Sequence, residues 1–199
     1  MTETRGPADR PPPEPAATGW LADVRRLDLA VYRAVAATPT PAIDTAMSRL
    51  SRSANKSRLW MATAAVVAAT GGRRGRRAAA QGMVCVAVSS AVVNLGIKRI
   101  ARRERPERDE TPQLRHVPMP GSLSFPSGHA ASAFAFATGV GHGAPALAVP
   151  LQATAAVVAY SRVHTGVHYP GDVLVGALIG TLVAQVTTRA VDRRLGPVA

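Results

Sequence analysis

Long apolar runs alternate with short polar breaks over most of the chain, and this pattern predicts membrane helices. Asp, Glu, Lys and Arg are absent from residues 78–97, 117–161 and 173–188. About 20 consecutive apolar residues are enough for a helix to cross the hydrocarbon core of a bilayer. We therefore predict spanning helices at the following positions: an initial one from about residue 58 to 72, then 78–97, 127–142, 144–160 and 172–189.

The first of these spans is short, and the others are rich in small residues. Its uncharged core covers only residues 59–70, so it must tilt or let its flanking residues reach the interface. Ala, Gly and Ser dominate the later runs, and small side chains allow helices to approach closely inside a membrane. The fold class expected is all-α: an integral membrane helical bundle of about five spanning helices.

The segment that precedes the bundle has a different pattern. Residues 20–37 read as a helix, but five charged side chains are spread through it, which favours a helix lying in the membrane interface. The sequence leaves open whether this helix instead crosses the membrane. A second short amphipathic helix is predicted from about Ala42 to Leu50. The expected organisation is a disordered Pro-rich tail (1–18), interfacial amphipathic helices (19–57), the membrane domain (58–190) and a basic C-terminal tail (191–199).

The charge is strongly positive, with a formal net charge of +12. A basic excess can indicate nucleic-acid binding, but here the basic clusters flank apolar runs and no aromatic stacking pattern accompanies them. Lipid headgroups or a phosphate site fit better as partners. If Arg73–Arg77 face the cytoplasm, so do Arg189, Arg193 and Arg194, and the loops at 98–126 and 161–171 face outwards. The basic residues of the first outward loop go against this rule, which suggests that they belong to a functional site.

The first candidate motif follows the second predicted span. Lys98 and Arg105 are seven residues apart, so they would share one face of a helix that continues out of the membrane until Pro106 stops it. Two cations on one face can hold a dianionic phosphate. Basic residues after a membrane helix are also common as interface anchors. That reading, or recruitment of anionic lipid headgroups, is the expectation for the neighbouring Arg99, Arg102, Arg103 and Arg108.

The second motif, residues 125–129, immediately precedes the third predicted span. Ser127 is a suitable helix N-cap, and Gly128 allows a ligand to approach the backbone. Free N–H groups at a helix N-terminus attract anions. His129 would project from the first turn beside a phosphate bound there.

The third motif, residues 161–172, supplies a further cation and a second histidine. Arg162 is the cation, and His168 lies four residues before Asp172. That spacing allows the carboxylate to accept a hydrogen bond from one ring nitrogen and leaves the other nitrogen free to attack. His164, in the same motif, is expected to be a loop residue. Asn94, in the second span, is expected to be buried between helices.

The predicted topology brings the three motifs to one membrane face, where they indicate phosphoryl transfer. One histidine would attack, the aspartate would orient it, and the other histidine would protonate the leaving oxygen. The cations and helix N–H groups would stabilise charge on the equatorial phosphate oxygens.

This pattern resembles the signature of the type 2 phosphatidic acid phosphatase family. The pattern is Lys-x6-Arg-Pro, then Pro-Ser-Gly-His, then Ser-Arg-x5-His-x3-Asp, and residues 98–106, 126–129 and 161–172 meet every specified position. The resemblance covers about residues 58–190. It implies an all-helical fold and a metal-independent reaction with no cofactor. It also implies that His168 is the nucleophile, with Asp172 as its support and His129 as the general acid. The phosphate-binding residues implied are Lys98, Arg105, Ser127, Gly128 and Arg162.

The resulting expectation is a multi-pass cell-membrane enzyme with an extracytoplasmic site. It would hydrolyse a lipid phosphomonoester or diphosphate through a phosphohistidine. A polyprenyl-linked phosphate is favoured as substrate over a phosphatidic-acid-type lipid. Two alternatives stay open: a phosphotransferase that passes the phosphoryl group to a lipid acceptor, and a non-catalytic membrane scaffold. The oligomeric state cannot be predicted from the sequence.

Overall fold

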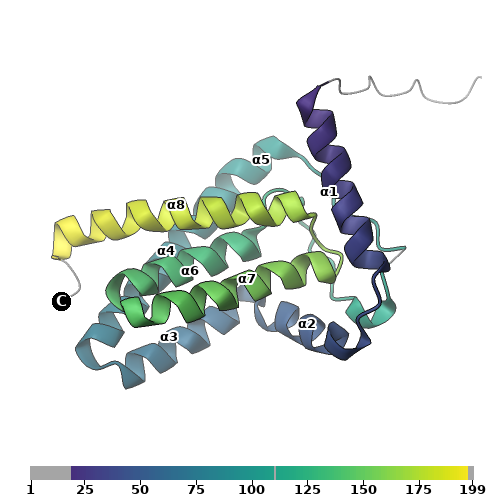
Figure 1. The fold of residues 1–199 in the computed structure, drawn as a ribbon. Coiled ribbons are helices and arrows are strands. Elements are labelled where there is room, and N and C mark those ends of the chain that lie inside the picture. Colours follow the sequence, from purple (N-terminus) through teal and green to yellow (C-terminus); the bar gives the residue numbers. More distant parts are fainter. Residues whose placement is uncertain (1–18, 110, 197–199) are drawn as a thin grey trace, which may run out of the picture.

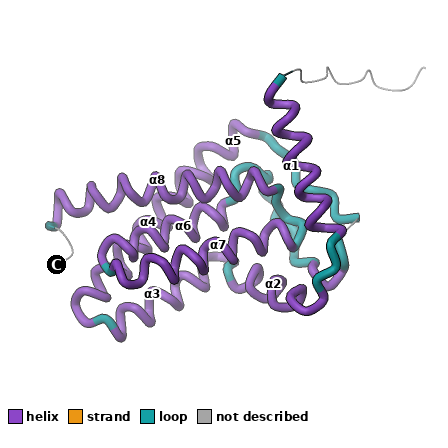
Figure 2. The backbone as a smooth tube through the Cα atoms, in the orientation of Figure 1, coloured by secondary structure: helices purple, strands orange, loops and turns teal. Residues whose placement is uncertain are grey.

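The helices of the protein follow its apolar segments closely. The computed structural model describes residues 19–109 and 111–196, and these residues form helices and loops without a strand (Figure 2). The tail predicted for residues 1–18 lies outside the described residues. The helices are α1 (Trp20–Ala37), α2 (Pro41–Ser53), α3 (Arg58–Thr70), α4 (Gly72–Ala91), α5 (Lys98–Ala101), α6 (Gly128–Gly143), α7 (Ala148–His164) and α8 (Pro170–Leu195). Short helical turns accompany them at η2 (Asn55–Ser57), η3 (Val92–Ile97, π-helical), η4 (Gln113–Arg115) and η5 (Pro145–Leu147).

Helix α6 lies at the centre of the bundle and packs against α4, α7 and α8 (Figure 1). Most of its side chains are small and buried, so the neighbouring backbones come very close. A Cβ atom built on Gly180 of α8 would lie 2.1 Å from the carbonyl oxygen of Ala131. One built on Gly139 would lie 2.9 Å from the Cα atom of Gly82. Glycine at these positions therefore sets the distance between α6 and its neighbours.

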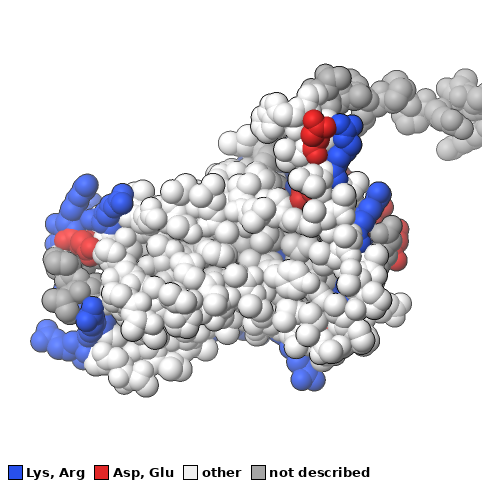
Figure 3. Space-filling model, viewed as in Figure 1, with Lys and Arg blue, Asp and Glu red and all other residues white. Residues whose placement is uncertain are grey.

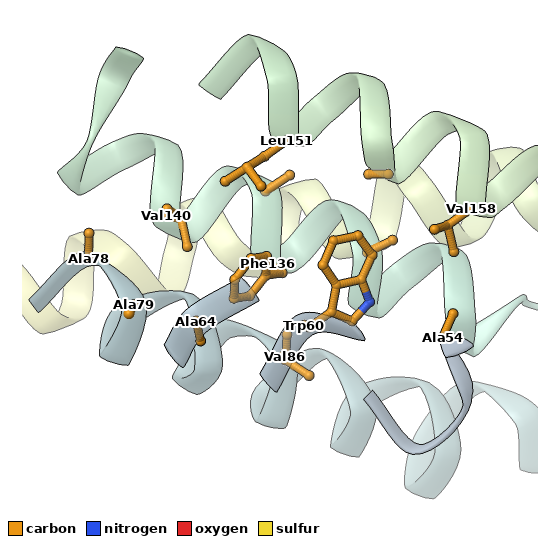
Figure 4. Close-up of a cluster of buried hydrophobic side chains, with 13 residues drawn as sticks. Ala54, Trp60, Ala64, Ala78, Ala79, Val86, Phe136, Val140, Leu151 and Val158 are labelled. Atoms are coloured by element: carbon orange, nitrogen blue, oxygen red, sulfur yellow. The ribbon is translucent and has the colours of Figure 1, made fainter. Parts of the chain in front are cut away.

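A cluster of larger apolar side chains fills the space between α3, α4, α6 and α7 (Figure 4). The rings of Trp60 and Phe136 lie 5.2 Å apart, and Val140, Leu151 and Val158 surround them. This packing fixes the N-terminal end of α3, which lies next to the candidate site.

Among the residues that the structure describes, three helical segments are long and apolar enough to cross a membrane: Gly72–Ala101, Pro145–His164 and Pro170–Arg194. Between charged ends, the flank of the molecule seen in Figure 3 carries almost no Lys, Arg, Asp or Glu. The chain is thus a membrane protein. The two other predicted spans correspond to α3 and α6, which have 13 and 16 residues and are short for a crossing helix. The total of five spanning helices stays a prediction.

Helix α1 is oriented across the end of the bundle, over the region where α7 ends and α8 begins (Figure 1). Its bounds agree with the predicted helix at residues 20–37. One face, which includes Trp20, Val24 and Leu27, is apolar and exposed. A neighbouring face buries Asp28 and Tyr32. This arrangement fits a helix that lies in the interface.

Three local predictions were wrong. The helix after the second span does not continue to Pro106: α5 ends at Ala101, and Arg102 adopts a positive φ of 28°. Lys98 and Arg105 therefore do not share a helix face, and Arg105 lies on an irregular segment. Pro106 disfavours helical backbone in Arg105 only, so the earlier helix end at Ala101 goes with the bonds that Arg103 and Arg105 make to partners in other segments.

The other two corrections concern basic segments. Arg73–Arg77 do not form a separate turn but the beginning of α4. The tail predicted from residue 191 instead continues α8 as far as Leu195, and residues 197–199 of this tail lie outside the described residues.

Candidate active site

A cavity of about 240 Å³ opens at the end of the bundle where α6 begins. Five of the predicted site residues line it: Lys98, Arg105, Gly128, His129 and His168. The remaining three, Ser127, Arg162 and Asp172, are buried directly behind the lining. The structure thus brings together residues from the three predicted motifs, which lie apart in the sequence.

His168 lies in the short connection between α7 and α8. Backbone hydrogen bonds hold this connection in place. The N–H groups of Val167 and His168 both donate to the carbonyl oxygen of Arg162, at 3.1 and 3.2 Å. Pro170 then starts α8, and the Asp172 side chain accepts a hydrogen bond from the Tyr169 N–H at 2.9 Å. This cap fixes the carboxylate next to the imidazole.

The two ring nitrogens of His168 have different surroundings. Nδ1 lies 3.5 Å from Asp172 Oδ2 and 3.4 Å from the Ser124 hydroxyl, which itself donates to Asp172 Oδ2. Nε2 lies on the cavity side, 3.2 Å from Arg105 Nη1. A guanidinium can only donate, so Nε2 is the acceptor and Nδ1 carries the proton in the neutral ring. The lone pair that faces the cavity is therefore the one required of a nucleophile.

The charge state of His168 also suits this chemistry. Burial lowers the pKa of this imidazole to about 4, and the positive charges of Arg105 and Arg162 act in the same direction. The hydrogen bond to Asp172 opposes this shift and only partly offsets it. At neutral pH the ring is uncharged and its Nε2 lone pair is available.

Two of the three predicted cations border the cavity. Lys98 Nζ donates to the Ser122 hydroxyl at 3.1 Å, and Arg105 donates to the carbonyl oxygens of Ser122 and Val167 at 2.8 and 2.6 Å. These bonds hold both side chains on the same wall. A Cβ atom built on Gly128 would lie 4.0 Å from Lys98 Nζ, so the start of α6 faces that ammonium group.

The third cation, Arg162, is 1% exposed and does not line the cavity. Its Nη1 donates to the Ser51 backbone and hydroxyl. Its Nε has no hydrogen-bond partner among the residues that the structure describes. A buried guanidinium with an unused donor is well suited to donate a hydrogen bond to an additional oxygen atom.

The N-terminus of α6 provides the remaining predicted residues. Ser127 caps the helix, since its side chain accepts a hydrogen bond from the Ala130 N–H at 3.4 Å. The Ser127 N–H donates to the Asp172 carbonyl oxygen at 2.9 Å and ties the start of α6 to the start of α8. His129 Nε2 lies 2.9 Å from Asn55 Oδ1, which can only accept, so this nitrogen carries a proton.

Several residues near the site have environments that the sequence did not reveal. Ser124 and Asn55 contact the two histidines, yet neither belongs to a recognisable pattern. Arg103, expected to be a lipid-facing residue, instead donates to Asp172 Oδ1 at 2.9 Å. Asn94 was expected to be buried between helices, but it is exposed and lines the cavity.

His164 was predicted to be a loop residue, but it is the buried last residue of α7. Its Nε2 lies 2.9 Å from Asp44 Oδ1, which also accepts a hydrogen bond from Arg115 Nε at 2.9 Å. Although burial opposes it, the hydrogen bonds from Thr40 and His164 and the charge of Arg115 lower the pKa of Asp44. This cluster joins α2 to α7 behind the site.

Comparison with known proteins agrees with this description. The model of the PAP2 superfamily matches residues 79–195. Decaprenylphosphoryl-5-phosphoribose phosphatase from Mycolicibacterium smegmatis is 38% identical over 164 residues, which cover 78% of this chain and 84% of that protein.

Two solved structures share the fold. The crystal structure of Aquifex aeolicus LpxE matches with a TM-score of 0.67 and 24% identity, over 82% of this chain and 95% of that one. A transmembrane PAP2-type phosphatidylglycerolphosphate phosphatase from Bacillus subtilis matches with a TM-score of 0.65 and 21% identity, over 87% and 88%. The helical membrane fold and the family match confirm the predicted resemblance, and the chain belongs to the PAP2 superfamily of membrane phosphatases.

Proposed function

We propose that this membrane phosphatase hydrolyses a lipid phosphate through a phosphohistidine formed on His168. The observation that carries the proposal is the pair of environments around this imidazole. Its Nδ1 faces a buried carboxylate, and its Nε2 faces a cavity bordered by cations. That arrangement supports a neutral histidine nucleophile aimed at an anion.

In the first step, Nε2 of His168 attacks phosphorus while the bond to the lipid oxygen breaks. Asp172 stabilises the positive charge that develops on the ring, because its carboxylate accepts a hydrogen bond from the Nδ1–H group. His129 protonates the leaving oxygen. In the second step, His129 takes a proton from water, the water oxygen attacks phosphorus, and inorganic phosphate leaves as His168 becomes neutral again.

Lys98, Arg105 and Arg162, together with Ser127 and the N–H group of Gly128 at the start of α6, would bind the equatorial oxygens of the phosphate. These groups stay next to the phosphate in both steps. They can therefore stabilise the negative charge that the transition state spreads over the equatorial oxygens. The unused Nε of Arg162 supports its assignment to this set.

A polyprenyl-linked phosphate is the substrate class that we favour. The similarity to a protein named decaprenylphosphoryl-5-phosphoribose phosphatase extends over most of both chains. A phosphatidic-acid-type substrate is the alternative. A panel of polyprenyl phosphates and phosphatidic acids in one detergent, compared by kcat/KM, separates the two, and a preference for phosphatidic acid would reject the polyprenyl assignment.

The test of the reaction is phosphate release by purified protein in detergent, with and without EDTA, and with His168→Ala as the control. We expect release to be unaffected by EDTA and abolished in the variant. Brief incubation with ³²P-labelled substrate should give acid-labile, alkali-stable label on the wild-type chain. Unchanged release by His168→Ala would reject this nucleophile, and loss of activity in EDTA would reject metal independence.

The same labelled substrate distinguishes the alternatives. Label recovered on an added lipid alcohol rather than as inorganic phosphate would favour a phosphotransferase. A complete lack of turnover across the panel would favour a non-catalytic scaffold.

A further inference from the structure

The carboxylate of Asp172 is held by more than its helix cap. Its Oδ2 atom accepts hydrogen bonds from Ser124 and from the Tyr169 N–H, and it faces His168. Its Oδ1 atom accepts a hydrogen bond from Arg103 Nη1 at 2.9 Å. Asp172 is fully buried, so the Arg103 guanidinium is the cation that compensates this charge at close range.

Arg103 is itself fixed on two further sides. Its Nη2 donates to Asp28 Oδ2 at 2.6 Å. The centre of its guanidinium lies 4.0 Å from the centroid of the Tyr169 ring, and Tyr32 packs edge-on against that ring at 5.5 Å. A planar guanidinium that bridges two carboxylates and stacks on an aromatic ring has little freedom to rotate.

Asp28 brings helix α1 into this arrangement. It lies on the buried face of α1, is 8% exposed, and its Oδ1 accepts a hydrogen bond from the Gly171 N–H at 2.7 Å. Gly171 is in the first turn of α8, one residue before Asp172. Asp28 therefore holds the start of α8 both directly and through Arg103.

We propose that Arg103 and Asp28 are positioning residues that hold the Asp172 carboxylate against His168, so that helix α1 is part of the active-site assembly. This inference rests on the proposed role of His168. Neither residue lines the cavity, and their side chains bond to Asp172, to each other and to the start of α8. Both act on the reaction through the orientation and charge of Asp172.

The test is a double-mutant cycle of Arg103→Gln and Asp28→Asn, with kcat and KM measured separately. Arg103→Gln should lower kcat by about tenfold or more, which corresponds to roughly 1.4 kcal/mol or more, and leave KM within about twofold. Asp28→Asn should lower kcat by a smaller factor. The double variant should lose less activation free energy than the sum of the two single losses, because Arg103 and Asp28 are bonded to each other and act in part through the same contact. Arg103→Lys should recover part of kcat, since it keeps the charge but cannot bridge two carboxylates.

Asp23→Asn is the matched control. It makes the same change of charge on the same helix, but Asp23 is exposed and pairs only with Arg26 among the described residues. It should leave kcat unchanged. Inhibition by inorganic phosphate reports on a correctly folded cavity and should be the same in all variants. If Arg103→Gln cannot be purified, Arg103→Lys and Asp28→Asn test the same contacts.

Each outcome is informative. Wild-type kcat in Arg103→Gln and Asp28→Asn, or additive losses in the double variant, would overturn the inference. So would equal losses in Asp23→Asn, since any change on α1 would then act alike. If His168→Ala is inactive, such results reject only the positioning role. If His168→Ala is active, the proposed function itself fails.

Discussion

The His168 imidazole combines two properties that seldom occur together, because it is buried among cations and yet bonded to a carboxylate. Burial and the charges of Arg105 and Arg162 lower its pKa, and the Asp172 contact opposes them. The pKa of about 4 shows that the lowering effects prevail. In the proposed mechanism, Asp172 therefore acts mainly by orienting the ring rather than by keeping it protonated in the resting enzyme.

The low pKa gives a prediction for the pH dependence. The protonated ring has no lone pair on Nε2, so attack is lost as the pH falls through the pKa of His168. Expressed per concentration of substrate dianion, kcat/KM should stay constant from pH 7 to about 5 and fall towards pH 4. The ionisation of the substrate is measured separately by ³¹P NMR. An acid limb near the ordinary histidine value of about 6.5 would contradict the buried environment described for this ring.

Ser124 leads to a second prediction for a single side chain. Its hydroxyl donates to Asp172 Oδ2 and lies 3.4 Å from His168 Nδ1, but it does not line the cavity. Ser124→Ala should lower kcat by about fivefold, the value of one modest hydrogen bond, with KM unchanged. Ser122→Ala is the comparison, because Ser122 contacts Lys98 and Arg105 at the cavity wall. It should chiefly raise KM, and the opposite assignment of the two effects would refute this division of roles.

At the scale of helices, most boundaries could be predicted because the sequence marks them. Pro41, the Gly71–Gly72 pair and Pro170 each stand at or next to a helix end in the structure. The end of α5 could not be predicted in this way. Lys98–Arg105 is compatible with a helix locally, and the chain leaves the helix because Arg103 and Arg105 bond to segments more than 60 residues away.

The candidate site shows the same limit. The motif spacing was sufficient to place His129, His168 and Asp172 together, because each sits at a helix start that the apolar pattern predicts. Asp28 and Ser124 were missed because a buried contact across 48 to 143 residues leaves no periodic signal in the sequence.

The close packing of α6 and α8 gives a prediction for these helices. A Cβ on Gly180 would lie 2.1 Å from a backbone oxygen, which cannot move without displacing α6. Gly180→Ala should therefore destabilise the protein by about 1–3 kcal/mol, seen as a lower thermal unfolding temperature in detergent. Gly96→Ala is the matched control, since a Cβ there meets nothing within 4 Å. Equal unfolding temperatures for the two variants would contradict the close approach.

On the scale of the whole molecule, the two ends of the bundle differ: one holds the cavity, and the other holds a group of arginines. The end opposite the cavity gathers Arg73, Arg74, Arg76 and Arg77 at the start of α4 with Arg189, Arg193 and Arg194 at the end of α8. Both helices bond to the end of α6 here: Arg74 Nε donates to the Gly143 carbonyl oxygen, and His142 pairs with Asp192. Basic residues that flank membrane helices favour the cytoplasmic side. We therefore infer that the cavity end lies outside the cytoplasm.

The single cysteine of the chain makes this orientation testable. Cys85 is buried, so Cys85→Ala gives a background free of thiols to which one cysteine is added at either end. Arg25→Cys, on the exposed side of α1, should react in intact cells with a maleimide that cannot cross membranes. Arg193→Cys should react only after the cells are opened. The reverse pattern would place the cavity in the cytoplasm, and the cations at Lys98–Arg105 would then follow the charge rule that they now oppose. Since the proposed phosphate site lies at the cavity end of the bundle, this experiment also tests from which leaflet the lipid substrate is taken.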